Sequence, residues 1–247
     1  MNNTTSIILS RMITASRTLD VIANNIANVS TPGYEATHIE SGAWIDRMRG
    51  ISAPPGGHSL AYTQALGTWR DARPGPIHRT GNPLDLAISG GGYFTVQTPN
   101  GPRLTRDGKF GLLPNGTIAD TAGNPLLDTG GQKITVPPQS GALTIAADGT
   151  ISTARGIIGQ VGVVTVTNPQ SLKAEGGNLF RATTAPLPAP DPRIVQGALE
   201  GSNVKPIVEI TRMMEASQNF QMIAQFVSAE QARDQTAMSQ LLGATTS

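Results

Sequence analysis

The amino-acid sequence predicts an α+β fold, with N- and C-terminal helices that pair as a coiled-coil layer and a central antiparallel β-rich domain. Apolar residues near the N-terminus recur at alternating intervals of four and three, which is the heptad pattern of packed helices. The middle of the chain holds four Asn-Gly or Asp-Gly dipeptides between short apolar runs, and these predict hairpins. A second stretch with helical spacing ends the chain.

The N-terminal helix is predicted from one apolar stripe that spans about three heptads. Arg11, Arg17 and Asp20 fall off this stripe. An isolated helix of this length is marginal in water, so the stripe needs a partner helix. The stripe and the residues that continue it are Ile8, Met12, Ala15, Leu19, Ile22, Ile26 and Val29.

The stretch "ANNIANVSTPGY" ends this helix and carries three asparagines, Asn24, Asn25 and Asn28. Asparagine is a mediocre helix former because its side chain competes for backbone hydrogen bonds. We therefore expect these side chains to make polar contacts with neighbouring chains or with the turn that follows. In that turn, Pro32 and Gly33 suit the second and third positions of a type II turn.

Five segments follow from the distribution of proline, glycine and apolar residues. The first 35 residues form the helix and its turn, and residues 36–82 form an extended connector that contains Pro and Gly. Residues 83–185 form the antiparallel β domain, because short Val-, Ile- and Thr-rich runs alternate there with turn dipeptides. Residues 186–200 read as a Pro-rich linker. Residues 201–247 form the C-terminal helix.

The C-terminal helix has a recognisable start and its own apolar stripe. Ser202 or Asn203 can cap it, and Pro206 falls in the first turn, where a missing N–H is tolerated. The stripe is thin and is interrupted by polar residues, which favours packing among several helices over a simple intramolecular hairpin. Its members are Met213, Phe220, Ala224, Val227, Met238 and Leu241.

Composition excludes several classes of protein. A net charge of +1 leaves no electrostatic footprint for nucleic acid. The chain has no cysteine, so neither disulfides nor thiolate metal sites can form. No apolar run is long enough to span a bilayer, and the N-terminal segment does not resemble a cleaved secretory signal. Export by a dedicated secretion apparatus would be compatible with such a sequence.

The sequence offers no catalytic, cofactor or metal site. His38, His58 and His78 share no helical turn and lack a carboxylate cluster, whereas zinc sites use closely spaced pairs. There is no nucleophile elbow, and the turn aspartates are explained by backbone conformation. We therefore expect a protein that is not an enzyme and needs no cofactor.

Three blocks of the chain, in the same order, resemble the rod and hook family of the bacterial flagellum. The stretch "NNIANVSTPGY" resembles the N-terminal signature of that family, although Ala23 stands where the family often has serine. "GNPLDLAISGGGYFTVQTPNGPRLTRDGKFGLLPNGTI" resembles its β domain, and "GALEGSNVKPIVEITRMMEASQNFQ" resembles the start of its C-terminal helix. The matching signature residues are Asn24, Asn25, Ile26, Ala27, Asn28, Thr31, Gly33 and Tyr34.

The resemblance implies a structural subunit of the basal-body rod, exported unfolded through the flagellar type III apparatus without a cleaved signal peptide. The terminal helices would line the inner tube and contact other copies or other rod proteins, in the periplasm. They would be disordered in the free monomer and would order on assembly. Chain length leaves a proximal-rod and a distal-rod protein as candidates. Residues 36–82 lack the long Gln-rich stretch expected of the distal rod, and "IGQVGVVTVTNPQSLKAEGGNLF" followed by "VQGALEGSNV" looks more like the proximal-rod member.

Two readings from other classes remain open. A secreted protein that binds or cleaves glycan or peptidoglycan would place Trp44 and Trp69 in a groove beside carboxylates. An adhesin-like fibre would share the helices but would be displayed at the cell surface. The strand content of the purified monomer, and its binding to glycans, would separate these readings from a rod subunit.

Overall fold

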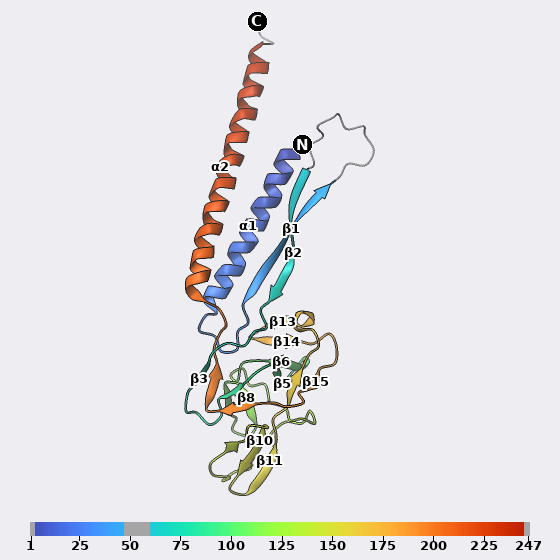
Figure 1. Ribbon diagram of the computed structural model, residues 1–247, viewed down its shortest axis with the longest axis vertical. Coiled ribbons are helices and arrows are strands. Elements are labelled where there is room, and N and C mark those ends of the chain that lie inside the picture. The colour runs from blue at the N-terminus through green and yellow to red at the C-terminus, as the bar shows by residue number, and fades with distance from the viewer. Residues whose placement is uncertain (1–2, 47–59, 245–247) are drawn as a thin grey trace. The chain divides into compact units, whose positions relative to one another are not determined.

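The chain consists of two long terminal helices and a middle made of short strands, and the computed structural model describes residues 3–46 and 60–244 (Figure 1). Helix α1 spans Asn3–Ala27 and helix α2 spans Pro206–Ala244. A single 3-10 turn, η1, covers Pro169–Ser171 and is capped by Asn168, whose side chain accepts a hydrogen bond from the Gln170 N–H. The protein is therefore α+β, as the sequence predicts.

Seventeen strands lie between the helices in the described part of the chain. In order they are β1 Thr37–Asp46, β2 Leu60–Arg70, β3 Ile77–Arg79, β4 Leu86–Ile88, β5 Tyr93–Thr98, β6 Gly101–Thr105, β7 Phe110–Leu112, β8 Ile118–Asp120, β9 Thr144–Ile145, β10 Thr150–Thr153, β11 Gly156–Gln160, β12 Val163–Thr165, β13 Lys173–Gly176, β14 Leu179–Arg181, β15 Leu187–Pro188, β16 Ile194–Gln196 and β17 Ala198–Glu200.

These elements separate into two compact units. The helical unit comprises Met1–Ile26, Thr37–Trp69 and Pro206–Ser247, and so contains α1, the paired strands β1 and β2, and α2. The β unit comprises Ala27–Ala36 and Arg70–Lys205. Each unit is thus built from segments that are far apart in the sequence.

The β unit is organised around a six-stranded antiparallel sheet with the order β13-β14-β6-β5-β12-β15. A three-stranded sheet, β11-β10-β9, and the pairs β16-β4, β17-β3 and β7-β8 complete it. Strands β5 and β6 form a tight hairpin in which Thr98 faces Gly101, the glycine of the first Asn-Gly dipeptide. The φ of Gly101 is +98°, a conformation that L side chains rarely adopt.

One apolar core fills the β unit. Phe94 and Phe110 meet edge to face, with their ring centroids 5.3 Å apart. The side chains of Phe94, Val96, Leu126 and Ile151 have no exposed surface. A smaller cluster, formed by Tyr93, Leu104, Leu172 and Phe180, packs beside β6 and β14. This core makes the β unit the better packed of the two.

Two ranges predicted as connectors contain regular strands. Within residues 36–82 the chain forms β1 and β2, which pair with each other. The segment between these two strands is too long for a two-residue turn signal to predict their pairing. Within residues 186–200 it forms β15, β16 and β17, which pair with β12, β4 and β3. Strand β15 contains Pro188 and lies at the edge of its sheet, where proline is tolerated.

Candidate assembly site

The heptad stripe of α1 forms the more buried face of that helix. Ile22 is buried, with 5% of its surface exposed, whereas Arg11, Arg17 and Asp20 are exposed. Leu9 and Ile13 lie off the stripe and are also exposed, at 57% and 47%, so α1 carries apolar surface on a second face. The half-buried members of the predicted set are Ile8, Met12, Ala15, Leu19, Ile26 and Val29.

The stripe on α2 differs in part from the predicted one. Phe220, Ala224 and Val227 are half-buried, but Met213 is 40% exposed. The side chains of Met238 and Leu241 lie outside what the structure describes. Among the described residues of α2, the buried and half-buried positions that the prediction missed are Glu209, Ala216, Ser217, Ile223 and Glu230.

The sequence does contain a spacing pattern that predicts the buried face of α2. Glu209, Ala216, Phe220, Ile223 and Val227 follow one another at intervals of seven, four, three and four, which is a heptad pattern. Glutamate is charged and alanine is only weakly apolar, so neither marks an apolar stripe, and the more hydrophobic Met213 was included in the predicted stripe in their place.

A groove runs between the two helices within the helical unit. Helix α1 contributes Ile8, Arg11, Thr14, Ala15 and Thr18. Helix α2 contributes Asn219, Met222, Ile223 and Phe226. Met222 and Phe226 are 60% and 55% exposed, so this groove keeps apolar surface in contact with solvent.

The three asparagines of the signature have three different environments. Asn25 has no exposed surface and hydrogen-bonds the backbone of Thr37 and the carboxylate of Glu209. Asn24 is exposed, and its amide donates to the Asp20 carbonyl one turn earlier. Asn28 accepts a hydrogen bond from the Thr31 hydroxyl, and its carbonyl accepts one from the Thr31 N–H. Asn25 therefore reaches α2 through Glu209.

Glu209 lies in the first turn of α2 and is almost fully buried. Its Oε1 atom accepts a hydrogen bond of 2.7 Å from Arg212, and its Oε2 atom accepts one of 3.2 Å from Asn25. Arg212 also lies 3.5 Å from Nδ1 of His38, whose ring packs on Trp69 with the centroids 4.7 Å apart. A carboxylate in the first turn also interacts favourably with the helix dipole.

The Pro-Gly turn belongs to the β unit. Tyr34 N–H donates to the Thr31 carbonyl across the turn, and the φ of Gly33 is +66°. A Cβ atom on Gly33 would lie 2.4 Å from the carbonyl carbon of Arg106, and the Gly33 N–H donates to the Glu200 carbonyl. Glycine is required here because both the backbone angle and the close approach exclude a side chain.

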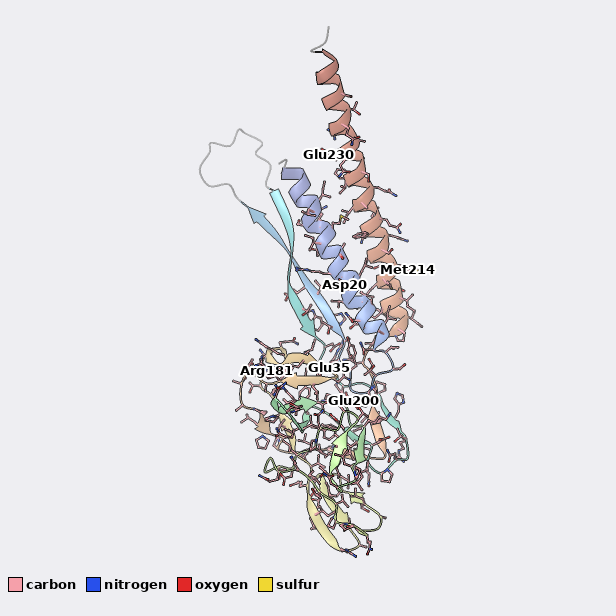
Figure 2. The ribbon with its side chains drawn as sticks, turned by 180° about the vertical axis from the view of Figure 1, so that it is seen from behind. Asp20, Glu35, Arg181, Glu200, Met214 and Glu230 are labelled. Atoms are coloured by element: carbon pink, nitrogen blue, oxygen red, sulfur yellow. The ribbon has the colours of Figure 1, made fainter. Side chains whose placement is uncertain are left out.

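Buried charges surround this turn, and Figure 2 labels two of them, Glu35 and Glu200. Glu35 pairs with Arg70 at 2.8 Å and accepts a hydrogen bond from the Tyr93 hydroxyl, while Arg106 pairs with Glu200 at 3.0 Å. Burial raises the pKa of Glu35, against the opposing effects of the Tyr93 hydrogen bond and of Arg70. The network thus joins residues of the β unit that are far apart in the sequence.

Features that would indicate chemistry are not seen in the described part of the chain. Across residues 3–46 and 60–244 no three acidic or histidine side chains are grouped to hold a metal ion. Of the three histidines, His38 packs on Trp69 and His78 lies in β3, while His58 is outside the described residues. Within those same ranges, neither helix combines the length and apolar character needed to cross a bilayer.

Three family models match the chain in the order of its elements. "Flagella basal body rod protein" matches residues 7–34, which cover most of α1 and the turn. "Flagellar hook protein FlgE/F/G D1 domain" matches residues 87–153 in the β unit. "Flagellar basal body rod FlgEFG protein C-terminal" matches residues 195–241, which include most of α2.

Relatives match over nearly the whole length of the chain. The flagellar basal-body rod protein FlgF of Caulobacter vibrioides is 35% identical over 243 residues, 98% of each chain. FlgF of Salmonella typhimurium is 37% identical over 87% of this chain and 90% of its own, and FlgG of Bacillus subtilis is 33% identical over 82% and 85%. Since the similarity spans both helices and the β unit, the chain belongs to the flagellar basal-body rod protein family that includes FlgF and FlgG.

Proposed function

We propose that this chain is a FlgF-like structural subunit of the proximal rod, which polymerises through its terminal helices. The rod would act as a hollow drive shaft that transmits torque and conducts exported subunits. The observation that carries the proposal is the large apolar surface that the two helices leave exposed. In this role α1 and α2 pair as a coiled-coil layer, and the subunit catalyses no chemical step.

The distribution of apolar side chains supports helix-mediated assembly. Among the described residues, nine of the fourteen large apolar side chains that are exposed lie on α1 or α2. Of the buried apolar residues in the described part of the chain, by contrast, two belong to the helical unit, Ile22 and Ala216. Exposed apolar surface of this kind marks an interaction site, and packing against other helices would remove it from water.

The partners we propose are further copies of this chain, other flagellar rod proteins, or both, arranged in a helical array. The rod would cross the periplasm, and the flagellar export apparatus would deliver the chain. The residues of the two predicted stripes and the three signature asparagines lie on or directly after the two helices, which supports an assembly surface formed mainly by these helices.

Substitution of the stripe tests the proposal. Ile22→Asp or Val227→Asp would put a charge into a helix–helix contact, which costs several kcal/mol when the charge is unpaired. We expect loss of incorporation into basal bodies and loss of swimming, with the β unit still folded. Ile157→Asp, at a 75% exposed position of the β unit, is the matched control and should swim. Normal basal bodies in both stripe variants would sink the proposal.

The distal rod is the second candidate, because FlgG of Bacillus subtilis is 33% identical over most of the chain. Complementation separates the two roles. Expression of this chain should restore swimming to cells that lack FlgF, but not to cells that lack FlgG. The opposite pattern would assign the chain to the distal rod.

A further inference from the structure

The chain passes four times between the helical unit and the β unit. Any force that travels along the backbone from one unit to the other therefore passes through four connections. Three of these adjoin residues 33–36, 70–73 and 200–205 of the β unit, which we call the connecting segments. How firmly these segments are held to one another decides how the β unit resists such a force.

The side chain of Asn203 hydrogen-bonds both of the other connecting segments. Its Oδ1 atom accepts from the Ala36 N–H at 2.7 Å. Its Nδ2 atom donates to the carbonyls of Asp71 and Arg73, at 2.7 and 2.8 Å. Both amide hydrogens thus bond backbone of the β unit instead of the first turn of α2, which begins at Pro206. One side chain therefore joins all three segments.

Main-chain hydrogen bonds run beside this side chain. The Asn203 N–H donates to the Tyr34 carbonyl at 3.3 Å, and the Asp71 N–H donates to the Ala36 carbonyl at 2.8 Å. Ala36 is 5% exposed, so removal of the Asn203 side chain would leave its N–H as a buried donor without that acceptor. A buried donor left unpaired costs its full desolvation free energy. Asn203 is therefore needed to complete this set of bonds.

An ion pair next to these bonds links fewer segments. Glu35, labelled in Figure 2, lies 2.8 Å from Arg70, and the pair joins residues 33–36 to residues 70–73. Asn203, by contrast, bonds to both of these segments and belongs to the third. Its side chain is thus the point at which the three connecting segments meet.

We propose that Asn203 fastens the three connecting segments to one another, so that a load carried between the helical unit and the β unit is shared among them. The load itself rests on the proposed function, since a rod subunit transmits torque. A pull on one segment must break its bonds to the other two at the same moment, which slows the opening step that governs forced unfolding. Without the Asn203 side chain, the segments are loaded one after another and each opens more easily.

Single-molecule pulling of the full-length free chain tests this. The chain has no cysteine, so Glu40→Cys and Ile207→Cys, at exposed positions just beyond the connecting segments, provide two unique attachment points. Force then enters the β unit through residues 33–36 and 200–205. Asn203→Ala should make the β unit open about tenfold faster at a given force, because three hydrogen bonds are lost.

Two controls separate fastening from a general loss of stability. Asn124→Ala removes another half-buried asparagine of the β unit, whose side chain bonds Asp120, and it should leave the opening rate unchanged. With attachment at Leu112→Cys and Ile157→Cys, two exposed positions of the β unit, Asn203→Ala should have a much smaller effect. Equal effects in the two pulling geometries, or no effect in the first, would overturn the proposal.

Swimming under load gives a second readout with a milder variant. Asn203→Ser keeps a polar group that is too short to bond both segments, and it should also speed opening in the first geometry. Cells that carry it should assemble basal bodies, because both helical stripes are unchanged, and should lose speed more steeply than unsubstituted cells as the viscosity of the medium rises. Asn124→Ala cells should match unsubstituted cells. An unchanged dependence on viscosity would overturn the load-bearing role.

The proposal and the proposed function can fail separately. The pulling measurements do not require assembly, whereas the stripe variants Ile22→Asp and Val227→Asp test assembly and leave Asn203 in place. Normal basal bodies in the stripe variants would contradict the proposed function alone, and equal opening rates in Asn203→Ala and the unsubstituted chain would contradict the fastening role alone.

Discussion

At the residue scale, Gly33 is the position where the signature turn tolerates no side chain. Gly33→Ala should destabilise the β unit by about 1–2 kcal/mol through its left-handed backbone alone, and further through the clash with Arg106. Gly81→Ala is the matched control, because Gly81 has a φ of +79° but no atom near a Cβ. Urea unfolding measures both variants. Equal losses of stability would show that the close approach contributes nothing.

Glu35 predicts a pH dependence whose sign follows from its burial. Because its pKa is raised in the folded chain, its contribution to stability is fully present below the unfolded pKa and is lost as pH rises through the folded pKa. The wild-type chain therefore loses this contribution as pH rises from about 4 to 7, whereas the glutamine of Glu35→Gln does not titrate. The free energy of unfolding of the variant, minus that of wild type, should increase over the same range.

An aspartate with the opposite shift is the control for this pH series. Hydrogen bonds from the backbone and hydroxyl of Thr150 lower the pKa of Asp148, so its contribution is lost as pH falls. Asp148→Asn should therefore become less stable relative to wild type as pH rises, the reverse of Glu35→Gln. The contribution of Asp148 changes only below about pH 4, where its carboxyl titrates, so its series is read by urea unfolding from about pH 4 downwards. If the two variants show slopes of the same sign in their respective pH ranges, the assignment of the Glu35 effect is wrong.

At the element scale, replacing a phenylalanine with alanine should change the stability of the chain by very different amounts in β5 and in α2. Phe94→Ala in β5 removes a fully buried ring from the core and should cost about 3–5 kcal/mol. Phe226→Ala in α2 removes a side chain that is 55% exposed, and should change the stability of the free chain by no more than about 0.5 kcal/mol. Thermal unfolding measures both, and similar losses would contradict the burial described for α2.

Three of the four turn dipeptides predicted hairpins that form, and the exception has a physical cause. Asn100-Gly101, Asn115-Gly116 and Asp148-Gly149 join β5 to β6, β7 to β8 and β9 to β10. Asp107-Gly108 joins β6 to β7, which do not pair with each other. Glycine is required at position 108 for a reason other than a hairpin turn. A Cβ atom there would lie 1.6 Å from the carbonyl oxygen of Leu86. Short-range signals cannot predict such a long-range approach.

At the scale of the whole molecule, the sequence predicted both helices and the family but not the contact that joins the helices. The heptad spacing identified Ile22 as a packed position, and it is buried. Asn25 looked like a defect in a helix because its partners, Thr37 and Glu209, follow it 12 and 184 positions later. The burial of Glu209 could not be predicted from the sequence, because an exposed glutamate is common in the first turn of a helix, where it interacts favourably with the helix dipole.

The two units should differ in stability because their cores differ. The β unit contains the continuous apolar cluster around Phe94, whereas among the described residues the helical unit buries Ile22 and Ala216. In urea, we expect the far-ultraviolet circular dichroism of the free chain to lose its helical signal before the strand signal, in two steps.

Assembly should reduce the difference in stability between the helical unit and the β unit. Binding to other subunits stabilises the folded helices by mass action, so the helical step should move to higher urea as rod material forms, while the β step of the free chain stays in place. Ile22→Asp should abolish this shift, since it introduces a charge into the packed face. A single coincident transition in the free chain would contradict the expectation, because it would require the helical unit to be as stable without partners as the β unit.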